Sequence, residues 1–126
     1  MVAKTQLVYQ LPKGFLVGLN YRYQSGRPWA RQIRVSSVAR ISTTINGEEL
    51  DGSRRVDDQS ILDLRLQKDF HLGGEASLAL FADVLNLTNN GANQGIASRR
   101  ADASAFGVPT VFIWPRRLMV GAKLHF

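Results

Sequence analysis

Apolar and polar side chains alternate at every second position along several stretches of this chain. Residues 15–24, 60–70, 75–87 and 116–126 show the pattern most clearly, and residues 5–11 show a fainter version. Helical periodicity is weak throughout. A period of two is typical of β-strands that have one apolar and one polar face. The sequence therefore predicts an all-β fold, an antiparallel meander of about five strands.

The connections between these predicted strands alternate between short and long. Pro12–Gly14 joins the first two strands and His71–Gly74 joins the next pair, whereas residues 25–59 and 88–115 are much longer segments. Loops beyond about 12–15 residues are uncommon in compact domains. Outer-membrane β-barrels, by contrast, combine short periplasmic turns with long extracellular loops. We therefore expect five transmembrane strands that form a piece of a large outer-membrane barrel, with 25–59 and 88–115 as extracellular loops.

Aromatic and charged residues agree with this arrangement. The predicted apolar faces place aromatic rings near the strand ends, where amphipathic rings favour the lipid–water interface. These interfacial aromatics are Phe15, Tyr21, Tyr23, Phe70 and Phe126. Most arginines fall in the two long segments, where they would lie beside the phosphates of lipopolysaccharide: Arg27, Arg31, Arg34, Arg40, Arg54, Arg55, Arg99 and Arg100. Lys68 is the one charge on a predicted lipid face, and it lies near a strand end, where a lysine can snorkel to water.

Four charged residues are predicted to face the barrel lumen: Arg22, Asp63, Arg65 and Asp83. They could contact a ligand or a plug domain. The interpretation that we favour is a cross-strand charge ladder that fills a wet interior. In that ladder Arg65 is expected to reach Asp83 on the neighbouring strand, as a direct or a diagonal pair.

Three stretches have a more specific pattern. Tyr21–Arg31 (YRYQSGRPWAR) contains a Ser-Gly-Arg-Pro-aromatic run at a strand exit, and Arg54–Phe70 (RRVDDQSILDLRLQKDF) contains Leu-Asp-Leu-Arg followed by a lysine. Leu78–Asn90 (LALFADVLNLTNN) is similar to an Asp-Val-Phe-Asn-Leu-Phe-Asn strand end, with Leu85 and Thr88 in place of the two Phe. Together they resemble the C-terminal barrel segment of a TonB-dependent outer-membrane receptor. The run ELDGSRRVDD before the third strand is most similar to the Oar-like, carbohydrate-regulatory branch.

The resemblance also implies a role for the last strand, LMVGAKLHF. Receptors of this class end on an aromatic residue that the barrel-assembly machinery recognises, in a polar-x-Gly-x-x-apolar-x-aromatic pattern. Gly121, Leu124 and Phe126 fit this barrel-assembly signal, while Met119 stands where a polar residue is usual. An aromatic end fixes the register of the strand at the membrane interface.

The resemblance implies uptake of a ligand across the outer membrane. Its partners would be outer-membrane lipid and lipopolysaccharide, the assembly machinery, the remainder of the receptor and, through it, TonB. Full receptors close about 22 strands around a plug. Five strands cannot close a membrane barrel, and residues 1–126 contain neither a plug nor a signal peptide. We therefore expect this chain to be a fragment of a longer protein.

Other kinds of site receive little support from the sequence. The chain has no cysteine, which excludes disulfides and thiolate metal sites. Asp57 and Asp58 could bind a cation, but their neighbours Arg54 and Arg55 make self-neutralisation the better interpretation. His71 and His125 lack further ligands at metal spacing. No nucleophile–base pair and no phosphate loop is visible, so we expect no metal, no cofactor and no enzymatic activity.

Two alternatives remain open at this point. The pI of about 10.3 and the net charge of +6 would also suit a small soluble β-barrel that binds nucleic acid. In such domains basic and aromatic residues share the binding strands, whereas here the aromatics share a face with Leu and Val. We therefore expect no nucleic-acid partner. An adhesion or structural role for an outer-membrane barrel is the other alternative. Asn86-Leu87-Thr88 matches a glycosylation pattern by chance.

Overall fold

The structure is a computed structural model that describes residues 1–36 and 41–126. The chain divides into two compact units. The first unit comprises Met1–Gln24, Gln59–Asn90 and Trp114–Phe126, and the second comprises Ser25–Asp58 and Gly91–Ile113. The described residues form nine strands and one short 3₁₀ turn, without an α-helix, and every strand pairing is antiparallel. The predicted all-β, antiparallel fold is therefore confirmed. None of the described residues belongs to a helix with the length and apolarity that crossing a membrane requires.

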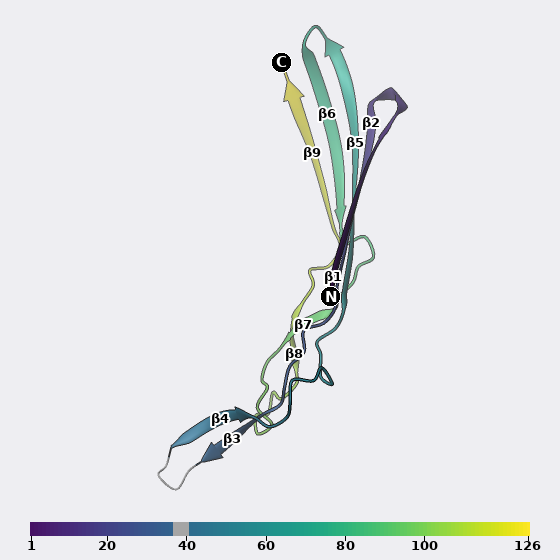
Figure 1. Cartoon of the computed structure of the whole chain (residues 1–126). Helices are drawn as coiled ribbons and strands as arrows, with labels where there is room; N and C mark the ends of the chain where they lie inside the picture. The colour runs from purple at the N-terminus through teal and green to yellow at the C-terminus, as the bar shows by residue number, and fades with distance from the viewer. Residues whose placement is uncertain (37–40) are drawn as a thin grey trace. The chain divides into compact units, whose positions relative to one another are not determined.

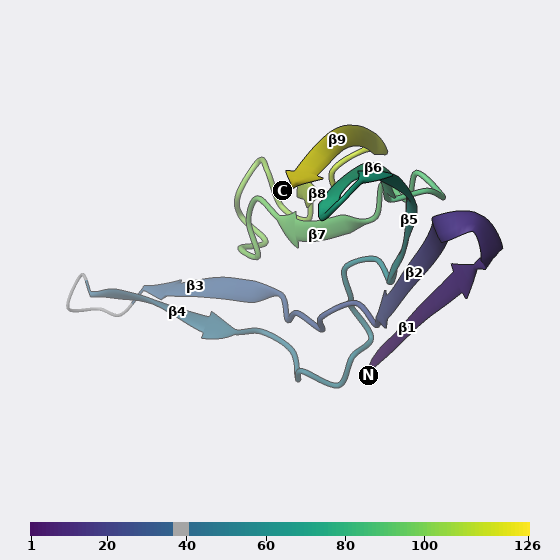
Figure 2. The same ribbon diagram turned by 90° about the horizontal axis from the view of Figure 1, so that it is seen from above.

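The first unit is a five-stranded sheet in the order β1-β2-β5-β6-β9 (Figure 1). Its strands are β1 (Val2–Leu11), β2 (Phe15–Gln24), β5 (Gln59–Gly73), β6 (Ala76–Leu85) and β9 (Arg117–His125). The 3₁₀ turn η1 (Pro12–Gly14) joins β1 to β2, with Lys13 and Gly14 at positive φ. Seen from above, the strands follow one another from β9 to β1 (Figure 2). Among the described residues the sheet is open, because β1 and β9 form its two edges.

The register places all five apolar faces on the same side of this sheet. Leu64 lies opposite Leu19 on β2 and Val84 on β6, and two residues further along Leu66 lies opposite Val17 and Ala82. Three rows cross all five strands in this way: Leu7-Leu19-Leu64-Val84-Leu118, Tyr9-Val17-Leu66-Ala82-Val120 and Leu11-Phe15-Lys68-Leu80-Ala122. Lys68 is the only polar residue in these rows. The period of two thus produces one continuous apolar face rather than five separate stripes.

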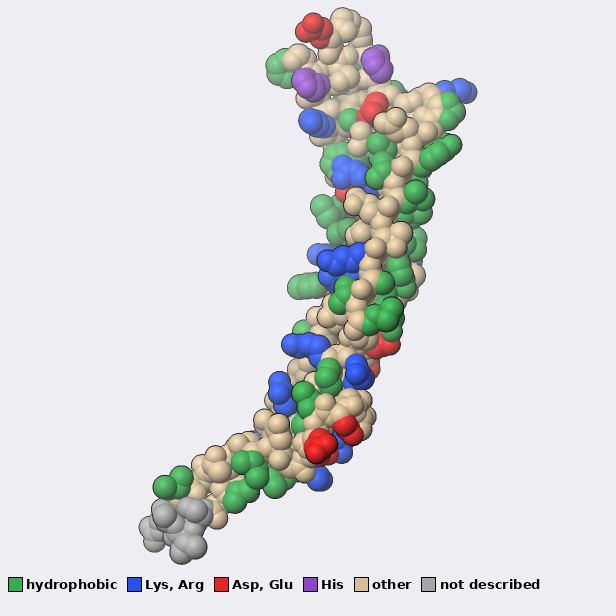
Figure 3. Space-filling model, in the orientation of Figure 1, with side chains coloured by type: hydrophobic (Ala, Val, Ile, Leu, Met, Phe, Trp, Pro, Cys, Tyr) green, Lys and Arg blue, Asp and Glu red, His purple; other side chains and the backbone are tan. Residues whose placement is uncertain are grey.

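No hydrophobic side chain of the first unit is buried. The buried hydrophobic residues of the described chain are Ala30, Val56, Ala92 and Ile113, and all four belong to the second unit. On the sheet, by contrast, Leu66 is 48% exposed and Val120 is 76% exposed. Hydrophobic side chains are visible at the surface along these strands (Figure 3). The apolar face is therefore uncovered in this structure.

The second unit contains two hairpins that the sequence did not predict. β3 (Gln32–Ser36) pairs with β4 (Ser42–Asn46), and β7 (Asn93–Ile96) pairs with β8 (Pro109–Phe112). The predicted loops 25–59 and 88–115 thus contain strands, which corrects the expectation of about five strands for the chain. Each of these strands has only four or five residues, too few for their alternation to be distinguished from chance. Arg40 lies outside the described residues.

The boundaries of the other strands differ slightly from the prediction. β1 begins at Val2 instead of residue 5, and β5 extends to Gly73. β6 ends at Leu85, two residues early, and Asn86 after it begins a turn with a positive φ of 54°. β9 ends at His125, and Phe126 follows it directly.

Candidate functional site

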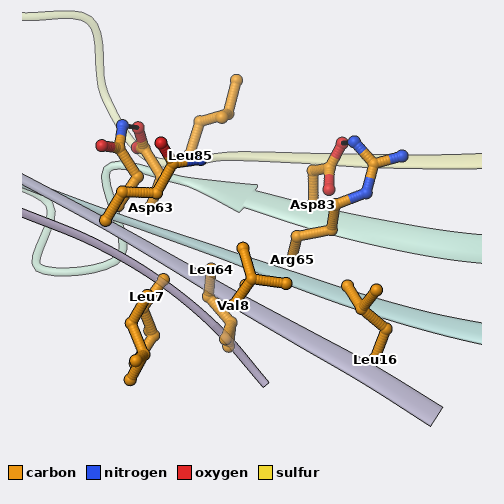
Figure 4. A pocket seen from close by; sticks show the side chains of 12 residues that line it. Leu7, Val8, Leu16, Asp63, Leu64, Arg65, Asp83 and Leu85 are labelled. Atoms are coloured by element: carbon orange, nitrogen blue, oxygen red, sulfur yellow. Dashed lines mark hydrogen bonds and ion pairs between the residues drawn. The ribbon is translucent and has the colours of Figure 1, made fainter. Parts of the chain in front are cut away.

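A cavity of about 260 Å³ lies against the five-stranded sheet (Figure 4). Residues of β1, β2, β5 and β6 line it, and half of them are Leu or Val; the polar members are Gln6, Asn20, Asp63, Arg65 and Asp83. Three of the four residues predicted to face a lumen therefore meet at one place. Arg22 lies on the same face, opposite Lys4 and Ile61, but does not line this cavity.

Arg65 and Asp83 form the predicted cross-strand pair. They are direct register partners on β5 and β6, and Arg65 Nη1 lies 3.6 Å from Asp83 Oδ2. The Arg65 guanidinium also lies 4.5 Å from the centre of the Phe81 ring. On the other side of Arg65 lies Gly18, where an added Cβ would make an ordinary van der Waals contact of 3.5 Å with the Arg65 Cβ. The charge pair is thus built into the sheet, as a ladder requires.

Phe81 is a member of this cluster that the sequence did not single out. Its ring lies over Gly121 on β9, where a Cβ would come within 2.9 Å of Phe81 Cε2. An aromatic ring that covers a glycine on the next strand shields the exposed backbone and fixes the register. Gly121, predicted as part of an assembly signal, therefore has a packing role in the sheet. The sequence does contain a clue to Phe81: it is an aromatic residue on the same face of the predicted strand as Ser77 and Asp83.

We expect the Arg65–Asp83 pair to contribute little to stability. The two side chains are 45% and 17% exposed, and ion pairs of this kind contribute about 0.2–1 kcal/mol. A double-mutant cycle with Arg65→Gln and Asp83→Asn, followed by urea unfolding, measures the coupling. A coupling free energy of several kcal/mol would contradict the view that this pair is a partly exposed charge ladder.

Asp63 joins the sheet to the turn that follows β6. Its Oδ2 accepts a hydrogen bond from Asn20 Nδ2 at 3.3 Å, and its Oδ1 accepts one from the backbone N–H of Asn86 at 2.8 Å. Asp63 therefore stabilises the start of the turn Asn86–Asn90. Its position corresponds to the second residue in the Leu-Asp-Leu-Arg run of β5.

Asn86 is the centre of this turn. Its side chain is 4% exposed; its Nδ2 donates to the carbonyl oxygens of Asn90 and Trp114, both at 2.9 Å, and its Oδ1 accepts from the Asn90 N–H at 2.9 Å. Asn89 Oδ1 in turn accepts from the N–H of Arg116 at 2.9 Å. The turn thus ties the end of β6 to the start of β9. Asn86 Nδ2 thus donates both of its hydrogens within the structure.

Replacing Asn86 by alanine is expected to destabilise the sheet by about 2–4 kcal/mol. The variant removes the three hydrogen bonds that the Asn86 side chain makes with Asn90 and Trp114, and alanine tolerates the positive φ less well than asparagine. Urea unfolding of the purified chain measures the loss. Thr88→Ala is the matched control: Thr88 is an exposed residue of the same turn, so its free energy of unfolding should change by less than about 0.5 kcal/mol. Equal effects of the two substitutions would contradict the role given to Asn86.

Four of the predicted interfacial aromatics, Phe15, Tyr21, Tyr23 and Phe70, lie on the apolar face of the sheet, and Phe126 follows the end of β9. Lys68 reaches across this face at its turn end: its Nζ lies 4.2 Å from the centre of the Phe15 ring and 5.5 Å from that of Phe70, and it donates to the carbonyl oxygen of Lys13. The Lys68 ammonium group therefore lies at the turn end of the sheet, beside two aromatic rings. At the other end of β2, the Tyr21 hydroxyl accepts a hydrogen bond from Ser60 Oγ at 3.2 Å.

The residues of the predicted assembly signal lie on β9 and just beyond it. Leu124 pairs with Leu78 on β6 and is 57% exposed, and Phe126 is 92% exposed. Tyr23, a predicted interfacial aromatic on β2, is the register partner of Ala3 on β1 and of Ser60 on β5. Trp114, which the sequence analysis did not select, precedes β9 and is 72% exposed, with Arg117 at 5.6 Å from its ring centre.

Asp57 and Asp58, the acidic pair of the second unit, accept hydrogen bonds from backbone N–H groups. Asp58 Oδ1 accepts from the N–H of Gly26, and Asp57 Oδ2 accepts from the N–H of Asn93, both at 2.8 Å. Of the adjacent arginines, Arg54 pairs with Glu48 at 2.6 Å, and Arg55 donates to the carbonyl of Gly26 at 2.9 Å. The adjacent side chains of an extended segment point in different directions, so sequence neighbours rarely pair.

Glu48 connects two segments of the second unit through its carboxylate. Its Oε1 accepts from the backbone N–H of Arg31 at 2.8 Å and from Arg54 Nε at 2.6 Å. The N–H of Arg31, followed by the Arg54 guanidinium, holds the pKa of Glu48 below its usual range, despite the opposing effect of desolvation. The carboxylate is therefore charged at neutral pH and holds Arg54 in place.

Metal ligands are not assembled in the described residues. No group of three or more His, Cys, Asp and Glu side chains there could hold a metal ion. His71 and His125 are register partners of the same residue, Ser77, on opposite sides of β6, so a whole strand separates them. What the geometry offers is a sheet with one apolar and one polar face, and a second unit with arginines and a tryptophan.

Searches against protein-family models, curated proteins and solved structures found no match for the chain.

Proposed function

We propose that the five-stranded sheet is part of the wall of an outer-membrane β-barrel, and that this barrel belongs to a TonB-dependent receptor that takes up a ligand. The observation that supports this most strongly is the continuous apolar face, which crosses all five strands without burying one hydrophobic side chain. Lipid-facing strands require such a face. The polar face with its charge pair would then line the lumen.

The exposure of the apolar face argues against a soluble protein in which this face would be in contact with water. Soluble domains bury one face of each sheet against another layer. Here Leu7 is 57% exposed and Leu118 is 69% exposed, at a cost of about 25 cal/mol for each Å² of apolar surface left in water. Contact with hydrocarbon removes that cost.

The ends of the sheet suit the interfaces of a bilayer. Lys68 directs its ammonium group to the turn at Lys13, between the rings of Phe15 and Phe70. In the proposed orientation this is the periplasmic end. The two open edges, β1 and β9, would pair with further strands of the barrel, because unpaired backbone groups are costly in lipid.

The assignment to TonB-dependent receptors rests on the stretches Tyr21–Arg31, Arg54–Phe70 and Leu78–Asn90. The geometry gives physical reasons for several of their residues. Gly26 leaves room for the Val56 carbonyl, Asp58 accepts from the Gly26 N–H, and Asn86 anchors the turn after β6. Lipopolysaccharide, the assembly machinery, the remaining strands and TonB are the partners of this proposal.

Cell fractionation tests the proposal and separates it from its alternatives. The protein that contains this chain, tagged and expressed from its own gene, should remain with outer membranes after carbonate washing. Uptake additionally requires contact with TonB, which site-directed crosslinking detects, whereas an adhesion or structural barrel would be found in the outer membrane without such contact. A protein found in the soluble fraction, with salt-sensitive retention of nucleic acid, would overturn the proposal in favour of a soluble binding domain.

A further inference from the structure

The second unit contains a cavity of about 180 Å³ that belongs to no site described above. Two arginines and a tryptophan line it: Arg27, Arg99 and Trp29. The other lining residues are Pro28, Val56, Gln94, Gly95 and Ile96. A water molecule occupies about 30 Å³ in the liquid, so the cavity is large enough for a small polyatomic ligand. The lining is of the kind that recognises a small anion.

Trp29 is a fixed wall of this cavity. Its backbone N–H donates to the carbonyl of Arg54 at 3.0 Å. Its ring makes an edge-to-face contact with Phe106 at 5.8 Å, and the Arg54 guanidinium lies 5.4 Å from its centre. Glu48 holds that guanidinium at 2.6 Å. The tryptophan is therefore preorganised, which lowers the entropic cost of binding a ligand against it.

The two arginines of the lining are available for a ligand. The ion pairs among the described residues of this unit use Arg31, Arg54 and Arg100. Arg27 donates one Nη2 hydrogen bond to the carbonyl of Gln94 at 3.2 Å, which leaves most of its donors unused and fixes its position at the cavity. Arg99 is held through its backbone, because its carbonyl accepts from the Gln32 N–H at 2.7 Å.

We propose that this cavity binds the phosphate group of a small phosphomonoester, with Arg27 and Arg99 on the phosphate oxygens and Trp29 against the organic part. Two guanidinium groups match the double charge of a phosphomonoester better than the single charge of a carboxylate. The cavity has room for a phosphate group and a few further atoms. Because it lies wholly in the second unit, this site does not depend on the location of the sheet in a membrane.

Tryptophan fluorescence provides a direct test. The chain has two tryptophans, Trp29 and Trp114, so a Trp114→Phe variant leaves Trp29 as the only reporter. Titration with glycerol 3-phosphate and with inorganic phosphate should give a saturable change of emission at constant ionic strength, and acetate should not. In that background Arg27→Gln and Arg99→Gln should each weaken binding by about tenfold, because each removes charge-assisted hydrogen bonds.

Arg34→Gln is the matched control, because Arg34 is an exposed arginine of the same unit on β3 and does not line the cavity. It should leave the affinity unchanged. Equal losses for all three arginine variants, or no saturable response to either phosphate compound, would overturn the proposal. A parallel titration with lipopolysaccharide, before and after phosphatase treatment, identifies the source of the phosphate. If the fluorescence responds to lipopolysaccharide but not to glycerol 3-phosphate or inorganic phosphate, the small-ligand proposal is overturned. Circular dichroism of each variant verifies that it is folded.

Discussion

The Gly26→Ala variant is expected to lose about 3 kcal/mol of stability in the second unit. The added Cβ would overlap the carbonyl oxygen of Val56 and lie 2.7 Å from its carbonyl carbon. These are backbone atoms, and three hydrogen bonds hold them in place: Gly26 N–H to Asp58 Oδ1, Arg55 Nη1 to the Gly26 carbonyl and Val56 N–H to the Arg27 carbonyl. No side-chain rotation can relieve the overlap, so the two segments must separate.

Urea unfolding and limited proteolysis within residues 25–58 measure this effect. Gly91→Ala is the matched control in the same unit, because a Cβ there meets nothing within 4 Å and Gly91 has no positive φ. Its free energy of unfolding should change by less than about 0.5 kcal/mol. If Gly26→Ala were as stable as Gly91→Ala, the close approach of residues 26 and 56 would be absent from the folded protein.

The Leu66→Arg variant is expected to reduce insertion into the outer membrane strongly. Leu66 lies on the apolar face of β5, between Val17 and Ala82. An arginine on the lipid face of a barrel costs about 2–4 kcal/mol at the middle of the bilayer. The side chain is 48% exposed in this structure, so in a protein surrounded by water the same substitution should be nearly neutral. The substitution therefore distinguishes lipid from water on this face.

Leu72→Arg is the control for this experiment. Leu72 lies on the same strand, near the turn to β6, and is 58% exposed. Near the interface the cost of an arginine falls to about 0–1 kcal/mol. The amount of each variant in washed outer membranes, relative to its total synthesis, gives the result. Normal insertion of Leu66→Arg would contradict a lipid-facing role for this side of the sheet.

The sequence predicted the sheet well because its signal is long and regular. Strands of nine to fifteen residues give enough alternation to identify both faces, and matching faces fix the register. The direct pairing of Arg65 with Asp83 followed from the same reasoning. Turn chemistry also helped, since Pro12–Gly14 forms the expected tight connection.

The second unit was harder to predict because its order depends on contacts between distant segments. Gln32 pairs with Arg100 and Pro28 pairs with Arg55 through single bridges, which leave no periodic signal in the sequence. Asp57 and Asp58 accept from backbone N–H groups of distant segments, and the charges of neighbouring residues in the sequence do not reveal such contacts. In the sequence Asn86 stands out only as part of a glycosylation pattern, although asparagine is common in turns and tolerates the positive φ that it adopts here.

Accessibility of single cysteines along β5 is the most direct test of the central claim. The chain has no cysteine of its own, so residues 62 to 67 can each be replaced by cysteine, spin-labelled and reconstituted in lipid bilayers. The account predicts a period of two: labels at positions 62, 64 and 66 collide mainly with oxygen dissolved in lipid, and labels at 63, 65 and 67 collide mainly with a water-soluble nickel complex. Equal access of the nickel complex to all six positions would show that both faces meet water, and would contradict the assignment of this sheet to a membrane barrel.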